Sequence, residues 1–158
     1  MMAARKIFER PTVIARFALC SALLALSTLP AAAQNDVAAA AAKEPGAVVT
    51  ASGLVYRSLK DGSGPSPSAS DKVKVHYRGT FPDGKEFDSS YSRNQPAEFP
   101  LNRVIKCWTE GVQMMKVGGK AKLTCPAGIA YGEKGAGGGL IPPNATLLFE
   151  VELLGING

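Results

Sequence analysis

Three short segments of this chain place an apolar residue at every second position, and this periodicity constrains the fold more than any other feature. In Lys72-Val-Lys-Val-His-Tyr-Arg78 an apolar side chain occupies every second position, and Lys120–Cys125 and Thr146–Leu154 repeat the pattern. A period of two places successive side chains on opposite faces of a strand. Each segment is therefore predicted to be a strand with one buried face, which requires a second layer packed against the sheet.

Two further strands and one helix complete the predicted layers. Extended structure is also expected over Gly53–Lys60 and Glu86–Ser89; a loop rich in Gly, Pro and Ser follows the first, and a Pro-Asp-Gly turn precedes the second. In Val104–Met115 the apolar positions that follow Trp108 by four and seven residues share one helical face with it. The predicted fold class is α+β, an antiparallel sheet of about five strands with one short helix on its apolar face.

The first 33 residues are typical of a secretory signal peptide. A basic segment over residues 5–16 precedes an apolar run over residues 17–29, and Ala31-Ala-Ala33 follows. The apolar run is shorter than the ~20 residues that span a bilayer, which argues against a transmembrane anchor. We expect cleavage after Ala33, a periplasmic or secreted location, and no stable membrane association after cleavage.

The rest of the chain is predicted to hold a linker and one domain. Residues 34–51 form an Ala-rich linker, either a disordered tether or a frayed helix, and residues 52–158 form the domain. The net charge is +5, but the signal peptide carries four basic residues and one acidic residue, which leaves +2 on the remainder. Nucleic-acid binding is not expected, because nucleic-acid-binding proteins concentrate basic charge on the folded domain.

Six segments, in this order, give residues 52–156 a resemblance to a known family. They are Val75-His-Tyr-Arg-Gly79, Asp83-Gly-Lys-Glu-Phe-Asp-Ser-Ser90, Val104-Ile-Lys-Cys-Trp-Thr-Glu-Gly111, Ala130-Tyr-Gly132, Ile141-Pro-Pro-Asn-Ala-Thr-Leu147 and Phe149-Glu-Val-Glu-Leu-Leu154. The chain resembles the FKBP-type peptidyl-prolyl cis-trans isomerases, within them the bacterial secreted branch that includes macrophage infectivity potentiator proteins. The resemblance implies a twisted antiparallel sheet half-wrapped around one short helix, with a proline pocket between the two.

The resemblance also assigns roles to residues of this chain. Tyr77, Asp88 and Tyr131 would be the catalytic residues. The substrate-binding residues would be Phe87, Arg93, Phe99, Val104, Ile105, Trp108, Ile141 and Phe149. Trp108 would form the pocket floor. Taken alone, Trp108 and Tyr77 would be interpreted as core residues, Asp88 as a turn residue and Tyr131 as an exposed aromatic; their joint occurrence in the family pattern favours the pocket.

The implied activity is acceleration of Xaa-Pro bond rotation during the folding of exported proteins. The implied partners are proline-containing polypeptides and macrolides such as FK506 or rapamycin, bound by a monomer. The alternative is a binding module, a chaperone or macrolide-binding domain with little turnover. No cofactor or metal is expected, because the chain has one histidine, His76, on the outward side of its strand, and lacks a phosphate-binding glycine loop.

The chain also departs from the family pattern at two places. Cys107 stands where many relatives have glycine, and Cys125 ends the strand expected beneath the helix. Since Cys20 leaves with the signal peptide, we expect Cys107 and Cys125 to form a disulfide that contributes about 3 kcal/mol; two reduced, buried cysteines are the alternative. Ala97 lies where some relatives carry an aromatic residue, so one pocket edge is expected to be more open.

Overall fold

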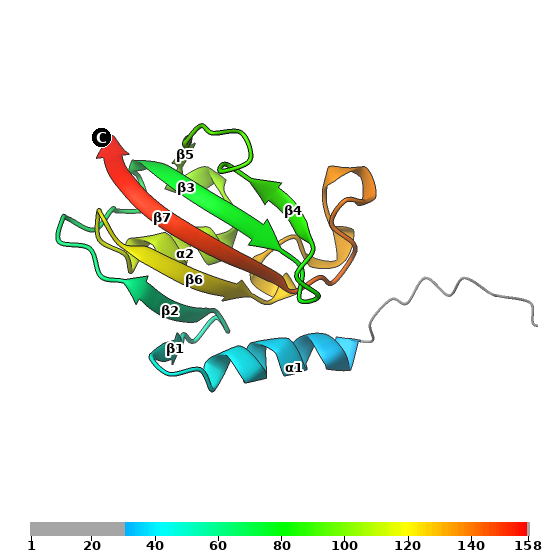
Figure 1. The fold of residues 1–158 in the computed structure, drawn as a ribbon. Coiled ribbons are helices and arrows are strands. Elements are labelled where there is room, and N and C mark those ends of the chain that lie inside the picture. Colours follow the sequence, from blue (N-terminus) through cyan, green and yellow to red (C-terminus); the bar gives the residue numbers. More distant parts are fainter. Residues whose placement is uncertain (1–30, 158) are drawn as a thin grey trace, which may run out of the picture.

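The computed structural model describes residues 31–157, in which seven antiparallel strands form one sheet (Figure 1). The strands are β1 (Ala47–Val49), β2 (Val55–Lys60), β3 (Lys72–Thr80), β4 (Glu86–Ser89), β5 (Ala97–Pro100), β6 (Lys120–Cys125) and β7 (Leu147–Asn157). The helices are α1 (Ala31–Ala42) and α2 (Lys106–Gln113), with short 3-10 turns at Leu101–Arg103, Ala127–Ile129, Gly132–Lys134 and Gly137–Gly139. The strand order is β1-β2-β6-β7-β3-β4, and β5 also pairs with β3. The predicted α+β class is confirmed.

The alternating pattern of β3 becomes an alternation of buried and exposed side chains. Val73, Val75 and Tyr77 are buried, whereas Lys72 and Lys74 are exposed. The buried face of the sheet packs against α2, which lies across the sheet behind β6 and β7 in Figure 1. The second layer that the alternation required is therefore the single helix α2.

One edge of β3 is shared by two short strands. β5 pairs with Lys72–Val75 at the start of β3, and β4 pairs with Arg78–Thr80 at its end. The opposite edge of β3 pairs with β7 along its whole length. The side chains of β4 and β5 thus come together beside the middle of β3, where Tyr77 faces the core.

The helix begins two residues later and ends two residues earlier than the predicted range Val104–Met115. Leu101–Arg103 forms a 3-10 turn first, and its Leu101 side chain is completely buried. Val104 and Ile105 then adopt extended backbone angles (ψ of 175° and 149°) before α2 starts. Val104 and Ile105 therefore precede the helix in an extended conformation and are not part of its first turn.

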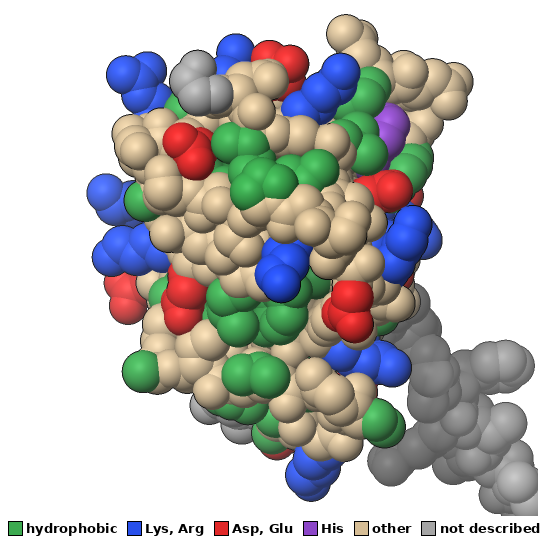
Figure 2. All heavy atoms as spheres, turned by 90° about the vertical axis from the view of Figure 1, so that its left-hand side faces the viewer, with side chains coloured by type: hydrophobic (Ala, Val, Ile, Leu, Met, Phe, Trp, Pro, Cys, Tyr) green, Lys and Arg blue, Asp and Glu red, His purple; other side chains and the backbone are tan. Residues whose placement is uncertain are grey.

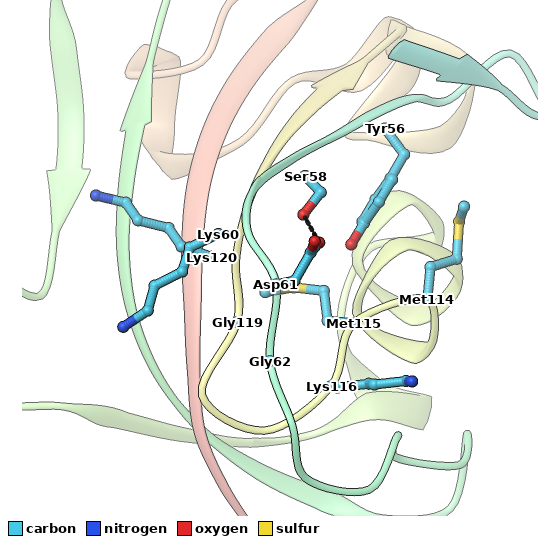
Figure 3. Close-up of a pocket in the computed structure, with 10 residues that line it drawn as sticks. All are labelled: Tyr56, Ser58, Lys60, Asp61, Gly62, Met114, Met115, Lys116, Gly119 and Lys120. Carbon is cyan, nitrogen blue, oxygen red and sulfur yellow. Dashed lines mark hydrogen bonds between the residues drawn. The ribbon is translucent and has the colours of Figure 1, made fainter. Parts of the chain in front are cut away.

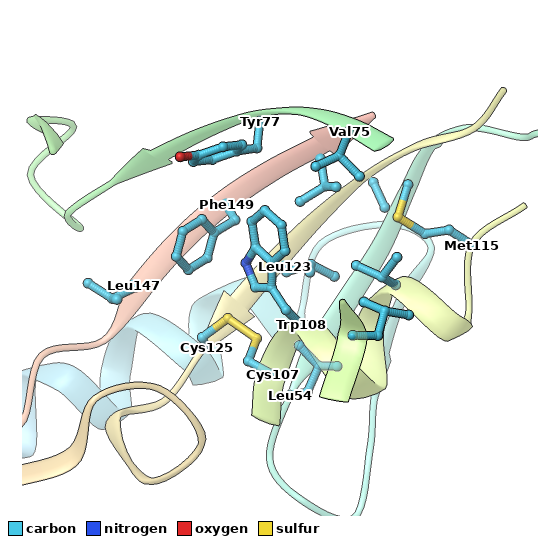
Figure 4. Packing of buried hydrophobic residues seen from close by; sticks show 14 of the residues in the cluster. Leu54, Val75, Tyr77, Cys107, Trp108, Met115, Leu123, Cys125, Leu147 and Phe149 are labelled. Carbon is cyan, nitrogen blue, oxygen red and sulfur yellow. A yellow bond between two sulfur atoms is a disulfide. The ribbon is translucent and has the colours of Figure 1, made fainter. Parts of the chain in front are cut away.

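The core between α2 and the sheet is held by close contacts and by one covalent link (Figure 4). Cys107 and Cys125 form a disulfide with 5.8 Å between their Cα atoms, which is within the usual range for disulfides. This is the pairing that the sequence predicted, and it joins α2 to the end of β6. On the same helix, a Cβ at Gly111 would lie 2.8 Å from the end of the Leu123 side chain, so glycine lets the helix lie close to the sheet without displacing that side chain.

The outer face of β2 and β6 is covered near the N-terminal segment, which the sequence did not predict. Thr124 alternates with the core-facing residues of β6, yet it is buried, as is its cross-strand partner Val55. α1 contacts both β2 and β6. Glu44, just after α1, accepts hydrogen bonds from Arg57 (2.8 Å) and Lys122 (2.9 Å), which tie the segment to both strands.

The estimate of about five strands missed β1 and β5. β1 lies in the predicted linker, residues 34–51, and pairs with β2. The predicted signal peptide, residues 1–33, falls almost entirely outside the described residues. Within residues 31–157 no helix combines the length and the apolar character needed to cross a bilayer. Figure 2 shows basic and acidic side chains interspersed on one face, with hydrophobic groups between them.

Candidate functional site

A cavity of about 330 Å³ lies where β3, β4, β5 and β7 meet the start of α2 and the loop after β6. Its lining residues are Tyr77, Phe87, Asp88, Phe99, Arg103, Val104, Ile105, Trp108, Tyr131 and Phe149. All of them except Arg103 are residues that the sequence analysis assigned to the pocket. Segments separated by more than 50 residues in the chain therefore contribute to one concave site.

Trp108 is the centre of the aromatic lining. Its ring meets three others edge to face, with centroid distances of 5.2 Å to Tyr77, 5.6 Å to Phe99 and 5.4 Å to Phe149. Edge-to-face contacts of this kind are favourable because the positive edge of one ring meets the negative face of another. Trp108 is 4% exposed and Phe149 is equally buried, so this part of the lining belongs to the hydrophobic core.

Gly79 allows the remaining aromatic wall to close. It pairs with Asp88 on one side and with Phe149 on the other. A Cβ at this position would lie 2.5 Å from the Phe87 ring and 3.0 Å from the Phe149 ring. The absence of a side chain at Gly79 therefore lets Phe87 lie across β3 and contact Phe149, with 5.6 Å between the ring centroids.

Three polar side chains form a network beside this aromatic lining. The Tyr77 hydroxyl donates a hydrogen bond to Asp88 Oδ2. Arg93 Nη1 donates to Asp88 Oδ1 at 2.6 Å, and Arg93 Nη2 donates to the Tyr77 hydroxyl oxygen at 3.0 Å. Each carboxylate oxygen of Asp88 thus has a donor, and the guanidinium balances its charge.

The protonation states of this network follow from the same contacts. Burial alone would raise the pKa of Asp88, but hydrogen bonds from Tyr77 and Arg93 outweigh burial and lower it. Burial and the Asp88 hydrogen bond raise the pKa of the Tyr77 hydroxyl. At neutral pH Asp88 is therefore a carboxylate and Tyr77 is a protonated donor.

The segment that carries Asp88 and Arg93 is fixed to β3 by Ser90. The Ser90 hydroxyl, fully buried, accepts a hydrogen bond from the Tyr77 N–H at 2.8 Å and lies 2.9 Å from His76 Nδ1. The Ser90 N–H donates to the Tyr77 carbonyl at 2.9 Å. His76 is half-buried and stacks on Tyr91, so its role in the described structure is structural.

Two aromatic residues of the lining carry a donor that has no partner among the described residues. The Trp108 Nε1–H is buried and makes no hydrogen bond. The Tyr131 hydroxyl, on a side chain that is 39% exposed, makes none either, and burial raises its pKa. An unpaired buried donor costs about 1–3 kcal/mol, so a ligand acceptor that reached the Trp108 N–H would gain from it, and a second acceptor could bond the exposed Tyr131 hydroxyl.

The structure leaves two of the assigned residues outside the lining and adds one. Arg93 is not part of the lining, although it donates hydrogen bonds to the lining residues Asp88 and Tyr77. Ile141 is buried in the core, and its backbone pairs with Ala136. Arg103 lines the cavity, yet nothing in its sequence context marked it, because it precedes the first motif position, Val104, by one residue.

A second cavity of about 380 Å³ lies between β2, the start of β6 and the end of α2 (Figure 3). It is lined by Tyr56, Ser58, Lys60, Asp61, Gly62, Met114, Met115, Lys116, Gly119 and Lys120. Ser58 donates to Asp61 at 2.7 Å, and Tyr56 is its only aromatic residue. Although this cavity is larger, it contains none of the converging rings and none of the carboxylate network, so the smaller cavity is the better candidate. Among the described residues no group of three His, Cys, Asp or Glu side chains could hold a metal.

Comparisons with known proteins agree with this geometry. The family described as FKBP-type peptidyl-prolyl cis-trans isomerase matches residues 64–154. FkpA of Aeromonas hydrophila, an FKBP-type peptidyl-prolyl cis-trans isomerase, is 58% identical over 122 residues, which are 77% of this chain and 45% of that protein. The chain therefore spans less than half the length of this relative.

Two solved structures have the same fold. The crystal structure of FkpA from Escherichia coli superposes with a TM-score of 0.77 at 48% identity, over 80% of this chain and 58% of the other. A peptidyl-prolyl cis-trans isomerase from Pseudomonas syringae pv. tomato superposes with a TM-score of 0.75 at 40% identity, over 80% of this chain and 92% of the other. The chain belongs to the family of FKBP-type peptidyl-prolyl cis-trans isomerases.

Proposed function

We propose that this domain accelerates cis-trans rotation about Xaa-Pro bonds, and that it does so in the cavity around Trp108. The observation that carries the proposal is one cavity lined by six aromatic rings, with a charge-balanced carboxylate at its edge. Its volume of about 330 Å³ suits a prolyl residue and its neighbours. Membership of the family supports the same activity.

The chemistry needs neither a nucleophile nor a metal. The barrier to rotation is about 18–20 kcal/mol because resonance gives the peptide bond partial double-bond character. Twisting removes this resonance, so the twisted amide is less polar than the planar one. An aromatic cavity therefore favours the twisted amide over the planar one relative to water, and such differential binding lowers the barrier.

The polar groups at the cavity edge would hold the substrate while one end turns. The Tyr131 hydroxyl has a free donor, and Ile105 lies outside the helix, so its N–H has no intrahelical partner. Both can donate to substrate carbonyl groups and fix the substrate backbone. Asp88 presents its negative charge close to the rotating amide, and Arg93 and Tyr77 keep that carboxylate in one orientation.

The proposed setting is the folding of exported proteins in the periplasm. The signal peptide predicted over residues 1–33, with cleavage after Ala33, supports export. The Cys107–Cys125 disulfide supports an oxidising compartment. Proline-containing polypeptides are the proposed substrates, macrolides such as FK506 or rapamycin are proposed ligands, and the proposed state is a monomer.

A peptide isomerisation assay tests the proposal. We expect the rate of cis-trans isomerisation of a Leu-Pro peptide to rise in proportion to enzyme concentration. We also expect a macrolide to inhibit this isomerisation. The alternative is a binding module, for which peptide or macrolide binding would be detected by calorimetry while the isomerisation rate stays at the uncatalysed value. An isomerisation rate that stays at the uncatalysed value at micromolar protein would therefore refute the proposed enzymatic activity.

A further inference from the structure

Arg103 is the one cation among the residues that line the cavity. It ends the 3-10 turn Leu101–Arg103, directly before Val104. This turn is firmly held, because Leu101 is fully buried, its N–H donates to the Asp71 carbonyl at 3.0 Å, and the Thr109 hydroxyl donates to its carbonyl at 2.6 Å. The backbone at Arg103 therefore presents its long side chain from a fixed point on the cavity edge.

The positive charge of Arg103 is not balanced by the protein. Within residues 31–157 its guanidinium makes no hydrogen bond and no ion pair. The other charge in the lining, the Asp88 carboxylate, is already paired with Arg93 at 2.6 Å. Glu133 and Lys134, which follow Tyr131 closely in the chain, line no part of the cavity.

The adjoining helix adds positive potential on the same side. α2 begins at Lys106, it has no acidic residue in its first turn, and Ile105 provides no side-chain cap. The N-terminus of a helix carries a partial positive charge that an acidic residue usually balances. Here Lys106 stands in that first turn instead, so the start of α2 offers no acidic side chain to balance the charge of Arg103.

We propose that Arg103 is a specificity-determining residue that favours substrates with an acidic side chain next to the proline. While the prolyl ring occupies the aromatic cavity, the neighbouring carboxylate would pair with the Arg103 guanidinium at the rim. The inference rests on the proposed function, since it names the class of peptide that the same cavity prefers. Exposed ion pairs are worth little, so the preference is expected to be about two- to fivefold.

Two peptide pairs test the inference. One pair carries Glu or Gln directly before the proline, and the other carries Glu or Gln directly after it, so that charge changes while shape is kept. For the wild-type protein we expect kcat/KM to be about two- to fivefold higher for Glu than for Gln in at least one pair. The difference is expected in KM rather than kcat, and it should disappear at ~1 M salt, where charges are screened within about 3 Å.

The variants Arg103→Gln and Arg103→Glu should bring the Glu/Gln ratio to one and below one, respectively. The ratio within one variant cancels any general effect of the substitution on activity. Lys74→Gln is the matched control, because Lys74 is exposed on β3, lines no cavity and carries the same charge; its ratio should equal that of the wild type. A wild-type ratio of one in both pairs, or a ratio above one that survives Arg103→Gln, would overturn the inference. Absence of turnover of the Gln peptides would instead refute the proposed function itself.

Discussion

The indole ring of Trp108 on α2 stands edge-on to the phenyl ring of Phe149 on β7, with 5.4 Å between the centroids and 87° between the planes. This contact joins the two layers of the domain at the base of the cavity. The helix, the sheet and the disulfide beside Trp108 thus position the same ring. Packing and the proposed activity therefore depend on one set of contacts.

Phe87→Ala should lower kcat/KM about tenfold, because Phe87 supplies one apolar wall and its edge-to-face contact with Phe149. Phe81→Ala is the matched control, since Phe81 packs against Phe87 at 5.0 Å but does not line the cavity. Peptide isomerisation and thermal unfolding should be measured on both variants. Equal losses of activity in the two would remove Phe87 from the site.

Gly79→Ala should lower kcat/KM because its Cβ would displace the Phe87 ring, which lies 2.5 Å from that position. A smaller, flexible side chain at position 87 can move away from the new methyl group. The cost of Gly79→Ala should therefore be smaller when it is introduced into Phe87→Leu than into the wild type, and the two effects should not add. Additive effects on kcat/KM would show that Gly79 does not act through Phe87.

Asp88→Asn should destabilise the domain at neutral pH by about 1 kcal/mol, a modest value because this ion pair is partly exposed. The pKa of Asp88 is lowered in the fold, since hydrogen bonds from Tyr77 and Arg93 outweigh burial. A carboxyl whose pKa is lowered by folding adds stability at pH values above its pKa in the unfolded state. This stability is lost as the pH falls through its pKa in the folded state.

The difference in free energy of unfolding between wild type and Asp88→Asn should therefore be constant from pH 5 to 8 and shrink below about pH 3.8, the ordinary value for this group. Urea unfolding at a series of pH values measures it. A difference that widens toward acid would mean that the fold stabilises the protonated carboxyl. Arg93→Gln removes one of the donors to Asp88. Its difference in free energy of unfolding from the wild type should shrink over the same acidic range, but by a smaller amount.

Replacing both cysteines, Cys107→Ala with Cys125→Ala, should lower the free energy of unfolding by about 3 kcal/mol, because the link constrains the unfolded chain. Urea unfolding of the double variant and of the oxidised wild type gives the difference. In the presence of a reductant, the wild-type protein should have the same free energy of unfolding as the double variant, apart from the small effect of the two replaced side chains on packing. An unchanged urea midpoint would show that the link does not restrict the unfolded state.

The strongly patterned elements could be predicted from the sequence, and the short ones could not. The ranges of β4 and β6 agree with the prediction, and β3 and β7 extend beyond it by a few residues. β5 was missed because it is only four residues long, with one proline before it and another at its end. β1 is three residues long inside an Ala-rich segment, and only its pairing with β2 defines it.

Much of the candidate site followed from its motifs, but its geometry did not. Nothing in the chain indicates that Ile141 would turn into the core while Arg103 would line the cavity. Both outcomes depend on how the loop after β6 and the turn before α2 pack against the sheet, which are contacts between distant segments. Gly79 stood in a recognised motif, yet its closeness to two rings is visible only in three dimensions.

The central claim is that a prolyl peptide rotates against the ring of Trp108. Trp108 is the only tryptophan in the chain, so its indole N–H gives a single resonance in ¹⁵N-labelled protein. Titrating a Leu-Pro peptide while recording that resonance together with the cis-trans exchange of the peptide tests the claim in one experiment. We expect the indole resonance to shift saturably and exchange to become far faster than the tens to hundreds of seconds of the free peptide. Accelerated exchange with an unmoved indole resonance, or a shifted resonance without acceleration, would contradict the account.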